Sequence, residues 1–318
     1  MENKTYAFAS FVMPALNEEK NIELAVQSVL DQDLDIPFEL IIAVGRSRDK
    51  TNKIAKRLER ENPEIIRVIK NPKNNTAKGL NLAINEAQGE VVIRVDAHSE
   101  LTYEYASQAI KTLESTQAAN VGGLMHAIGT SPFQGAVAWG YGSRFGLGGG
   151  SFHVGGAEGE VDSVYLGVFD KQKLLAVGGF DEELIRGQDW ELNLRLRRAG
   201  HKVWFDPKLE VRYYPRGNWF SLAKQFYKTG RWRARLTRSA LSASRPRYFI
   251  PPMLVFGSLF VFPAIIYFLS VIFIALFARI EGASRGWLII VLPTMHYSWG
   301  LGFITGLLFK PQIRGIGS

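Results

Sequence analysis

An acidic and an imidazole side chain directly follow a short apolar stretch in the first third of the chain. Asp96 and His98 come at the end of residues 91–95, whose β-branched run is typical of a strand buried on both faces of a parallel sheet. Ligands of open α/β sheets bind at the carboxyl ends of such strands. A carboxylate there can hold a divalent cation, and a histidine can complete its coordination. The alternative is that Asp96 caps the next helix and His98 is a surface residue.

Strand and helix patterns alternate before this point. We expect Asn17 to cap a helix that begins at Glu18, with two acids in its first turn. The other expected elements are strands at 8–13, 38–44 and 65–69 and helices at 51–61 and 78–87. Alternation of this kind predicts an α/β fold with a mostly parallel central sheet.

The pattern changes after residue 100. Expected elements are a helix at 103–115, a helix that starts near Asp189 and runs through Arg198, and strands at 121–127, 164–169 and 201–205. Between them lies a glycine-rich tract at 140–159, interrupted by aromatic residues. It favours a mobile loop over a bound ligand or, equally, an irregular connection without a role.

Composition limits the possible classes of protein. The 318 residues suffice for one large or two smaller domains, and 47% of them are hydrophobic. The absence of cysteine excludes disulfides, thiolate metal sites and a cysteine nucleophile. A net charge of +8 suggests an anionic partner, and we expect no signal peptide at the start.

Two uncharged runs at the carboxyl end predict a membrane segment. Residues 250–277 and 286–309 each exceed the roughly 20 residues that a spanning helix needs. They predict a two-helix transmembrane hairpin within 250–318, whereas the alternative is a pair of buried core helices. Residues 216–249 before them are basic and lack acids. This basic segment predicts an interfacial helix and a cytoplasmic first domain, with lipid rather than nucleic acid as the anionic partner.

Several stretches together resemble family-2 glycosyltransferases of the GT-A fold, the Rossmann-like fold of nucleotide-diphospho-sugar transferases. In chain order they are 11–19, 45–51, 96–98, 178–181 with 188–190, and 225–232. The resemblance is strongest to the bacterial ExoA-like branch, which acts in succinoglycan exopolysaccharide assembly. It covers about residues 8–250 and implies that residues 1–215 form the GT-A domain.

The resemblance also implies site residues. Asp189 is expected to be the catalytic base. Nucleotide-sugar binding is expected from Pro14, Ala15, Asn17, Glu18, Gly45, Ser47, Lys78, Asn81, Asp96 and Ala97. The acceptor and diphosphate are assigned to Gln188, Trp190, Arg231 and Trp232, with Arg233 as a further positive charge. A divalent metal, Mg²⁺ or Mn²⁺, is expected on Asp96 with His98 or His153.

The chain departs from the family pattern at three places. Val44 stands where members often carry an acid that helps to hold the nucleobase. His98 replaces the second acid of the metal motif, which suits Mn²⁺ at least as well as Mg²⁺. Gln225 is too far from Arg231 for the motif of processive synthases, which argues against a processive polymerase.

The resemblance therefore implies a membrane-associated, inverting glycosyltransferase at a bacterial inner membrane. Its expected donor is a nucleotide-diphosphate hexose such as UDP-glucose, and its expected acceptor is a polyprenyl-diphosphate-linked saccharide. One alternative is a polyprenyl-phosphate glycosyltransferase that makes a lipid monophosphosugar. Another is a non-catalytic protein that binds a sugar nucleotide or lipid.

Overall fold

The computed structural model describes residues 5–148, 150–184, 187–239 and 246–308. The chain divides into two compact units. The sheet unit comprises Met1–His126 and Gly155–Tyr213, and the helical unit comprises Ala127–Val154 and Tyr214–Ser318. Residues 127–154, which the sequence-based division assigns to the first domain, thus belong to the helical unit.

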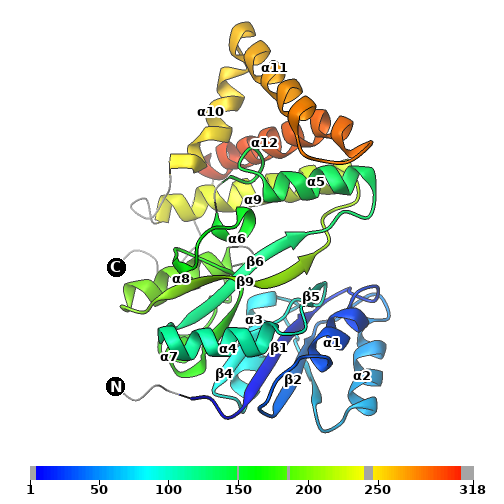
Figure 1. The fold of residues 1–318 in the computed structure, drawn as a ribbon, viewed down its shortest axis with the longest axis vertical. Coiled ribbons are helices and arrows are strands. Elements are labelled where there is room, and N and C mark those ends of the chain that lie inside the picture. The colour runs from blue at the N-terminus through cyan, green and yellow to red at the C-terminus, as the bar shows by residue number, and fades with distance from the viewer. Residues whose placement is uncertain (1–4, 149, 185–186, 240–245, 309–318) are drawn as a thin grey trace. The chain divides into compact units, whose positions relative to one another are not determined.

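The first half of the sheet unit is a parallel α/β layer (Figure 1). Its strands lie in the order β3-β2-β1-β4, and each of the three pairings is parallel. The elements are β1 Ala9–Ala15, α1 Ile22–Leu30, β2 Phe38–Val44, α2 Thr51–Glu61, β3 Ile66–Lys70, α3 Thr76–Glu86 and β4 Val91–Arg94. These positions confirm the alternation expected from the sequence.

The second half of the sheet is antiparallel, so the sheet is mixed and the expectation of a mostly parallel one is corrected. β8 pairs antiparallel with β4, and β6 pairs antiparallel with β8. The elements of this half are β5 Ser99–Leu101, α4 Tyr105–Thr116, β6 Asn120–Ala127, β7 Gly159–Glu160, β8 Tyr165–Asp170, α7 Lys171–Ala176, α8 Gln188–Arg198 and β9 Val203–Tyr213. The alternating pattern that indicates parallel crossovers ends at β4.

The central strands form the core of the sheet unit. Phe11 on β1 lies opposite Leu40 on β2 and Ile93 on β4, and all three are fully buried. Their neighbours Val12 and Ile41 are also fully buried, so these strands are covered on both faces. This burial fixes the register, because a slip by one residue would move each side chain to the other face.

Asn17 does not cap the first helix, and the expected start at Glu18 is wrong. The helix α1 begins at Ile22, and Asn17 has a left-handed φ of 58°. Its backbone N–H donates to Ser47 Oγ at 3.0 Å, and its Oδ1 accepts the N–H of Arg48 at 2.8 Å. Asn17 therefore joins the loops that follow β1 and β2, a tertiary role that competes with capping.

The glycine-rich tract is partly helical. Its first glycines, Gly140 and Gly142, lie in α5 Pro132–Gly142, which begins with Ser131 as N-cap and a proline in its first turn. A short helix, α6 Ser151–Val154, follows. Gly149 lies outside the described residues. The expected loop is therefore restricted to short connections around these two helices.

The rest of the helical unit contains the basic and apolar segments. Its elements are α9 Trp219–Ser239, the 3₁₀ turn η2 Pro246–Phe249, α10 Ile250–Gly257, α11 Val261–Phe277 and α12 Ser284–Leu308. Within the described ranges, only α12 is long and apolar enough to cross a membrane, and 44% of its most apolar window is buried. The first predicted span is divided between α10 and α11, so the two-helix hairpin is supported only in part.

We expect Gly89→Ala to destabilise the protein by about 1–3 kcal/mol, since a side chain there overpacks the core. A Cβ at Gly89 would lie 2.7 Å from the backbone N of Ser10 and 2.8 Å from the carbonyl O of Phe8. Thermal unfolding in detergent measures the shift. Gly286→Ala is the matched control, because nothing lies within 4 Å of its added Cβ. An equal shift in both variants would contradict the close approach.

Candidate active site

A cleft of about 210 Å³ lies at the carboxyl ends of β1, β3 and β4. Five of the residues expected from the sequence line it: Pro14, Ala15, Glu18, Asp96 and His98. Its other lining residues are Leu16, Asn71, Asn74, Asn75 and Thr76. The cleft therefore lies where open α/β sheets bind ligands.

Asp96 and Asp189 contact the same guanidinium. Arg94, the last residue of β4, donates from Nε and Nη2 to Asp96 Oδ1 at 3.1 and 3.0 Å, and from Nη1 to Asp189 Oδ1. The guanidinium also lies over the Phe180 ring, 5.7 Å from its centroid. The structure thus brings together two carboxylates that are 93 positions apart in the sequence. Their predicted roles as metal ligand and base stay predictions.

Burial and the Arg94–carboxylate attraction shift the pKa values of Asp189 and Arg94 in opposite directions. Burial raises the pKa of Asp189; the Arg94 charge opposes that effect, and the negative charge of Asp96 adds to it. Burial alone would lower the pKa of Arg94, yet the two carboxylates raise it above its ordinary value. Arg94 is therefore a permanent cation, and Asp189 is a carboxylate with increased affinity for a proton.

The residues at the metal position fit a cation that is shared with a substrate. Both hydrogen bonds from Arg94 end on Asp96 Oδ1, and His98 Nδ1 lies 3.1 Å from Glu18 Oε1. With a proton on Nδ1 facing that carboxylate, Nε2 is the ring nitrogen with the lone pair that could coordinate a metal. Among the described residues, no three His, Asp or Glu side chains form a ready-made metal site. Two protein ligands with diphosphate oxygens and water match the way Mg²⁺ is commonly held.

Reciprocal hydrogen bonds join the loops after β1 and β2. Besides the two bonds of Asn17, the N–H of Glu18 donates to Thr51 Oγ1 at 2.7 Å and that of Lys50 donates to Glu19 Oε2 at 3.0 Å. Gly45 is placed where a Cβ would lie 2.9 Å from Leu16 Cδ1. The expected nucleotide residues Asn17, Gly45 and Ser47 therefore build the wall next to the cleft rather than line it.

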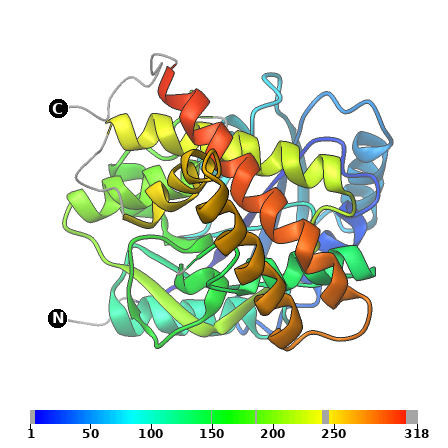
Figure 2. The same ribbon diagram turned by 90° about the horizontal axis from the view of Figure 1, so that it is seen from above.

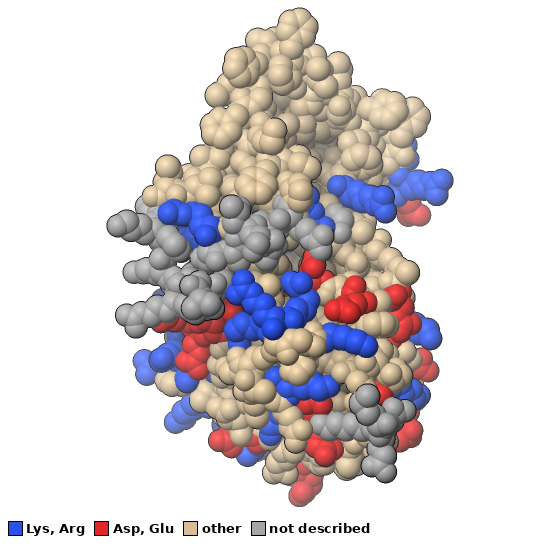
Figure 3. Space-filling view, turned by 90° about the vertical axis from the view of Figure 1, so that its left-hand side faces the viewer, with Lys and Arg blue, Asp and Glu red and all other residues tan. Residues whose placement is uncertain are grey.

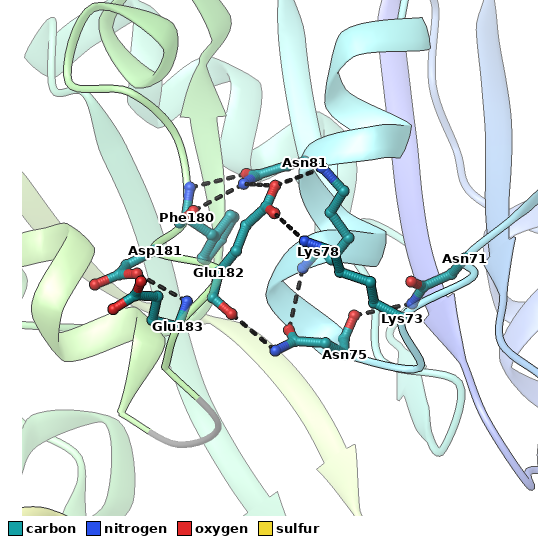
Figure 4. A network of polar contacts seen from close by, with 9 residues as sticks. All are labelled: Asn71, Lys73, Asn75, Lys78, Asn81, Phe180, Asp181, Glu182 and Glu183. Atoms are coloured by element: carbon teal, nitrogen blue, oxygen red, sulfur yellow. Dashed lines mark hydrogen bonds and ion pairs between the residues drawn. The ribbon is translucent and has the colours of Figure 1, made fainter. Parts of the chain in front are cut away.

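Lys78 and Asn81 hold a turn of the chain, as Figure 4 shows. Asn81 exchanges two hydrogen bonds with the backbone of Phe180, at 2.9 and 2.8 Å. Lys78 Nζ donates to Glu182 Oε1 at 2.9 Å. Burial acts to raise the pKa of Glu182, but hydrogen bonds from Lys78 and Asn81 lower it. In this arrangement both residues bind the segment that carries Phe180 under Arg94.

Three further expected residues are partly or wholly internal. Ala97 is buried in the core, so only its backbone is available to a ligand. Gln188 begins α8 and donates from Nε2 to the carbonyl O of Leu184 at 3.1 Å. Trp190, on the same helix, is buried with 7% of its surface exposed. Gln188 and Trp190 thus support the start of α8, where Asp189 lies.

The remaining expected residues belong to the helical unit. His153 packs against Tyr141 and Phe152, and burial, with the Arg247 charge, lowers its pKa to about 3. Arg231 and Trp232 lie on α9, where the Arg235 guanidinium lies 5.1 Å from the centroid of the Trp232 ring. Their expected contacts with metal, acceptor and diphosphate stay predictions.

Sequence reasoning missed Arg94 and the asparagines of the loop after β3. In the sequence, Arg94 is one residue of an otherwise apolar strand. A charged residue in such a run indicates that its side chain pairs with an opposite charge in the folded protein. Asn71, Asn74 and Asn75 read as turn residues. Their concentration at a strand end could have indicated a polar site.

The comparisons with known proteins identify the class. Residues 10–157 match the model of Glycosyl transferase family 2, so the chain carries a domain of this family. The fold is that of GT-A glycosyltransferases. The mannosyltransferase PcManGT from Pyrobaculum calidifontis, solved with GDP-Man and Mn²⁺, superposes with a TM-score of 0.64 at 16% identity, over 96% of this chain and 88% of that one.

Two relatives match nearly the whole chain. The succinoglycan biosynthesis protein ExoA of Rhizobium meliloti (strain 1021) is 28% identical over 93% of this chain and 94% of its own. A second relative, from Methanococcus voltae, is 29% identical over 95% of this chain and 97% of its own. It is named a dolichyl N-acetyl-alpha-D-glucosaminyl phosphate 3-beta-D-2,3-diacetamido-2,3-dideoxy-beta-D-glucuronosyltransferase. Residues 1–349 of S. aureus TarS, solved with UDP-GlcNAc, superpose with a TM-score of 0.55 at 17% identity, over 94% of this chain and 90% of that one. The chain spans 39% of a longer TarS chain.

We expect Arg94→Met to destabilise the protein by about 3 kcal/mol, because it leaves two carboxylates without their cation. The value is at the low end of the range for broken buried pairs, since 32% of the Asp189 side chain is exposed. Adding Asp189→Asn should restore part of the loss. Thermal unfolding of the single and double variants forms a cycle, and strict additivity would exclude the coupling.

We expect Asn81→Ala to speed hydrogen exchange at the amide of Phe180 at least about tenfold, since its acceptor is removed and the turn is released. Mass-resolved exchange over residues 178–184 measures it. Lys73→Met is the control, because Lys73 reaches Glu182 only at 4.0 Å with 68% of its side chain exposed. Unchanged exchange in the Asn81 variant would refute the tether.

Proposed function

We propose that the protein is a membrane-associated, inverting glycosyltransferase. It moves a hexose from a nucleotide-diphosphate sugar, with UDP-glucose the first candidate, to a polyprenyl-diphosphate-linked saccharide in exopolysaccharide or cell-surface glycan assembly. The membership of its domain in glycosyltransferase family 2 supports the reaction class. The whole-length similarity to ExoA supports the polysaccharide context.

One observation carries the proposal: Asp96 at the cleft and Asp189 at the start of α8 share the Arg94 guanidinium. The reaction needs a group that neutralises a leaving diphosphate and a base that deprotonates an alcohol. Asp96 and Asp189 supply carboxylates for these two tasks. Arg94 holds them close despite their equal charge.

The assignment of the base follows from its surroundings. Asp189 has a raised pKa, which favours acceptance of a proton, and about a third of its side chain is exposed to an incoming group. It takes the proton of the acceptor hydroxyl while that oxygen bonds to the anomeric carbon. The bond between the anomeric carbon and the diphosphate oxygen breaks, and the nucleoside diphosphate leaves. A single displacement of this kind inverts the anomeric centre.

The donor is bound by the cleft of the sheet unit. A divalent cation, Mg²⁺ or Mn²⁺, held by Asp96 with His98, would neutralise charge on the leaving diphosphate. Val44 is buried in the core and its carbonyl accepts the N–H of Asn71 at 2.7 Å, so its side chain does not read the base. That task passes to the asparagines at 71, 74 and 75, which line the cleft.

The lipid-linked acceptor agrees with the basic and apolar helices of the helical unit. We propose that the protein acts at the inner membrane of a bacterium, with its sheet unit in the cytoplasm. An assay that offers a polyprenyl monophosphate against a glycosyl diphosphate lipid separates this function from lipid-monophosphosugar synthesis. Metal-dependent hydrolysis of a panel of nucleotide sugars identifies the donor, and binding without any turnover would indicate a non-catalytic binder.

We expect Asp189→Asn to lower the rate of transfer by about 10²–10⁴-fold with donor affinity unchanged, because only the proton acceptor is lost. Initial rates with radiolabelled donor and calorimetric donor binding measure the two effects. Glu183→Gln is the matched control, an exposed acid of the neighbouring turn. Full turnover in a folded Asp189 variant would remove the assigned base.

A further inference from the structure

The long uncharged stretch at 250–277 is sharply bent in its first third. The helix α10 ends at Gly257, and α11 begins at Val261 after Phe260, whose φ of −109° and ψ of 135° are those of extended chain. Pro263 in the first turn of α11 has no N–H with which to continue a helix from α10. In Figure 1 the two helices form the arms of a V, and α12 lies across its open end.

The arms are too short for a spanning helix. At 1.5 Å per residue, the 8 residues of α10 extend about 12 Å and the 17 of α11 about 25 Å. The hydrocarbon core of a bilayer is about 30 Å thick. Because both arms start from the α12 layer, the shorter arm limits the tip to about the depth of one leaflet.

The tip and the outer faces of the V are apolar and exposed. Leu259 and Phe262 at the tip are 78% and 80% exposed. Further along α11, large side chains are exposed at Ile265, Ile266, Phe268, Leu269, Ile272, Phe273, Leu276 and Phe277. The surface of this part carries no charged side chain in Figure 3. Val271 and Ala275 of α11 are buried, but an exposed apolar surface of this size along the rest of the helix fits lipid as its surroundings.

The helix α12 packs against α9, the basic helix of this unit. Glycines bring the two backbones together: a Cβ at Gly302 would collide with the carbonyl O of Tyr227, and one at Gly306 with that of Arg231. Trp219 Nε1 donates to Thr294 Oγ1 at 2.8 Å, and Arg238 Nη1 donates to the carbonyl O of Leu307 at 2.7 Å. Seen from above in Figure 2, α12 crosses α9 obliquely, and the two helices are in contact.

Six positively charged side chains make α9 incompatible with the bilayer interior. They are Lys224, Lys228, Arg231, Arg233, Arg235 and Arg238, and α9 itself contains no acid. Charged side chains within a membrane are costly, so we expect α9 to stay outside the bilayer interior. Beyond Arg285 in its first turn, the large exposed side chains of α12 are apolar, with Trp287, Ile289, Ile290 and Leu301 between 40% and 47% exposed. One packed and one apolar exposed face are typical of a helix in the membrane interface.

We propose that the helical unit enters one leaflet from one side and does not span the membrane. The V of α10 and α11 is re-entrant, α12 lies in the plane of the interface, and the positive charge of α9 is attracted to anionic headgroups. This attachment goes beyond the proposed function and does not depend on it. It also places the connection at 278–283, with Arg279 and Glu281, on the same side as the sheet unit.

The absence of native cysteine makes a topology experiment direct. We choose three exposed positions for single-cysteine variants: Glu64→Cys in the sheet unit, Ala283→Cys before α12 and Leu308→Cys at its end. Intact spheroplasts and inside-out vesicles are treated with a membrane-impermeant maleimide. The expected result is that all three are labelled in the inside-out vesicles and none in the spheroplasts.

Two other labelling patterns would overturn the proposal. Labelling of Ala283→Cys, but not of the other two variants, in intact spheroplasts would indicate a hairpin that spans the membrane. Exposure of Leu308→Cys on the side opposite to Ala283→Cys indicates that α12 spans the membrane.

Insertion of the tip is tested separately with Val261→Cys, whose side chain is 73% exposed in the structure. The purified protein carries a fluorophore there and is reconstituted in vesicles of phosphatidylglycerol and phosphatidylethanolamine. Nitroxide groups on the acyl chains should quench it, and aqueous iodide should not. Ala283→Cys, labelled in the same way, is the control and should show the reverse. Quenching by iodide at both positions would show that the V does not enter lipid.

Discussion

The structure of the site depends on one cation between two anions. Without Arg94, the carboxylates of Asp96 and Asp189 would repel each other in a partly buried space, where Coulomb forces are strong. Arg94 is fixed in turn by its position at the end of β4, by the aromatic ring of Phe180 and by the turn that Asn81 binds. A pair of carboxylates from two halves of a mixed sheet thus depends on a single planar group with several donors.

The parallel half of the fold could be predicted from the sequence because local pattern and final structure agree there. Both ends of β2 and α2, and the last residue of α8, were expected at the residues where they occur. The start of α1 could not be predicted, since Asn17 forms its hydrogen bonds with a loop 30 residues away. The antiparallel pairing of β8 with β4 is likewise a long-range choice that no local pattern specifies.

The candidate site was predictable where a single residue type carries the signal. Its position at the end of a buried strand indicated Asp96, because carboxylates there are typical of cation binding, whereas Asp189 was expected from the family resemblance. Arg94 was not identified, because its role depends on the contact between the end of β4 and Asp189 at the start of α8. The sequence does not show that these two elements meet. Lys78 has the chemistry expected of it, a positive charge, but in the structure that charge pairs with Glu182. Sequence indicates what a side chain can do, and its neighbours decide what it does.

The insertion of α5 and α6 between β6 and β7 affects how the protein can be made and dissected. The Phe133 ring of α5 packs edge-on against Trp287 of α12, at 5.4 Å between centroids, and a Cβ on Gly140 would meet Met295 Sδ at 2.9 Å. During synthesis α5 leaves the ribosome long before α12, so the helical unit completes its packing only when the last helix has been made. For the same reason, removal of the carboxyl-terminal helices would not release a soluble enzyme with an intact surface. It would uncover an apolar helix in the middle of the remaining chain.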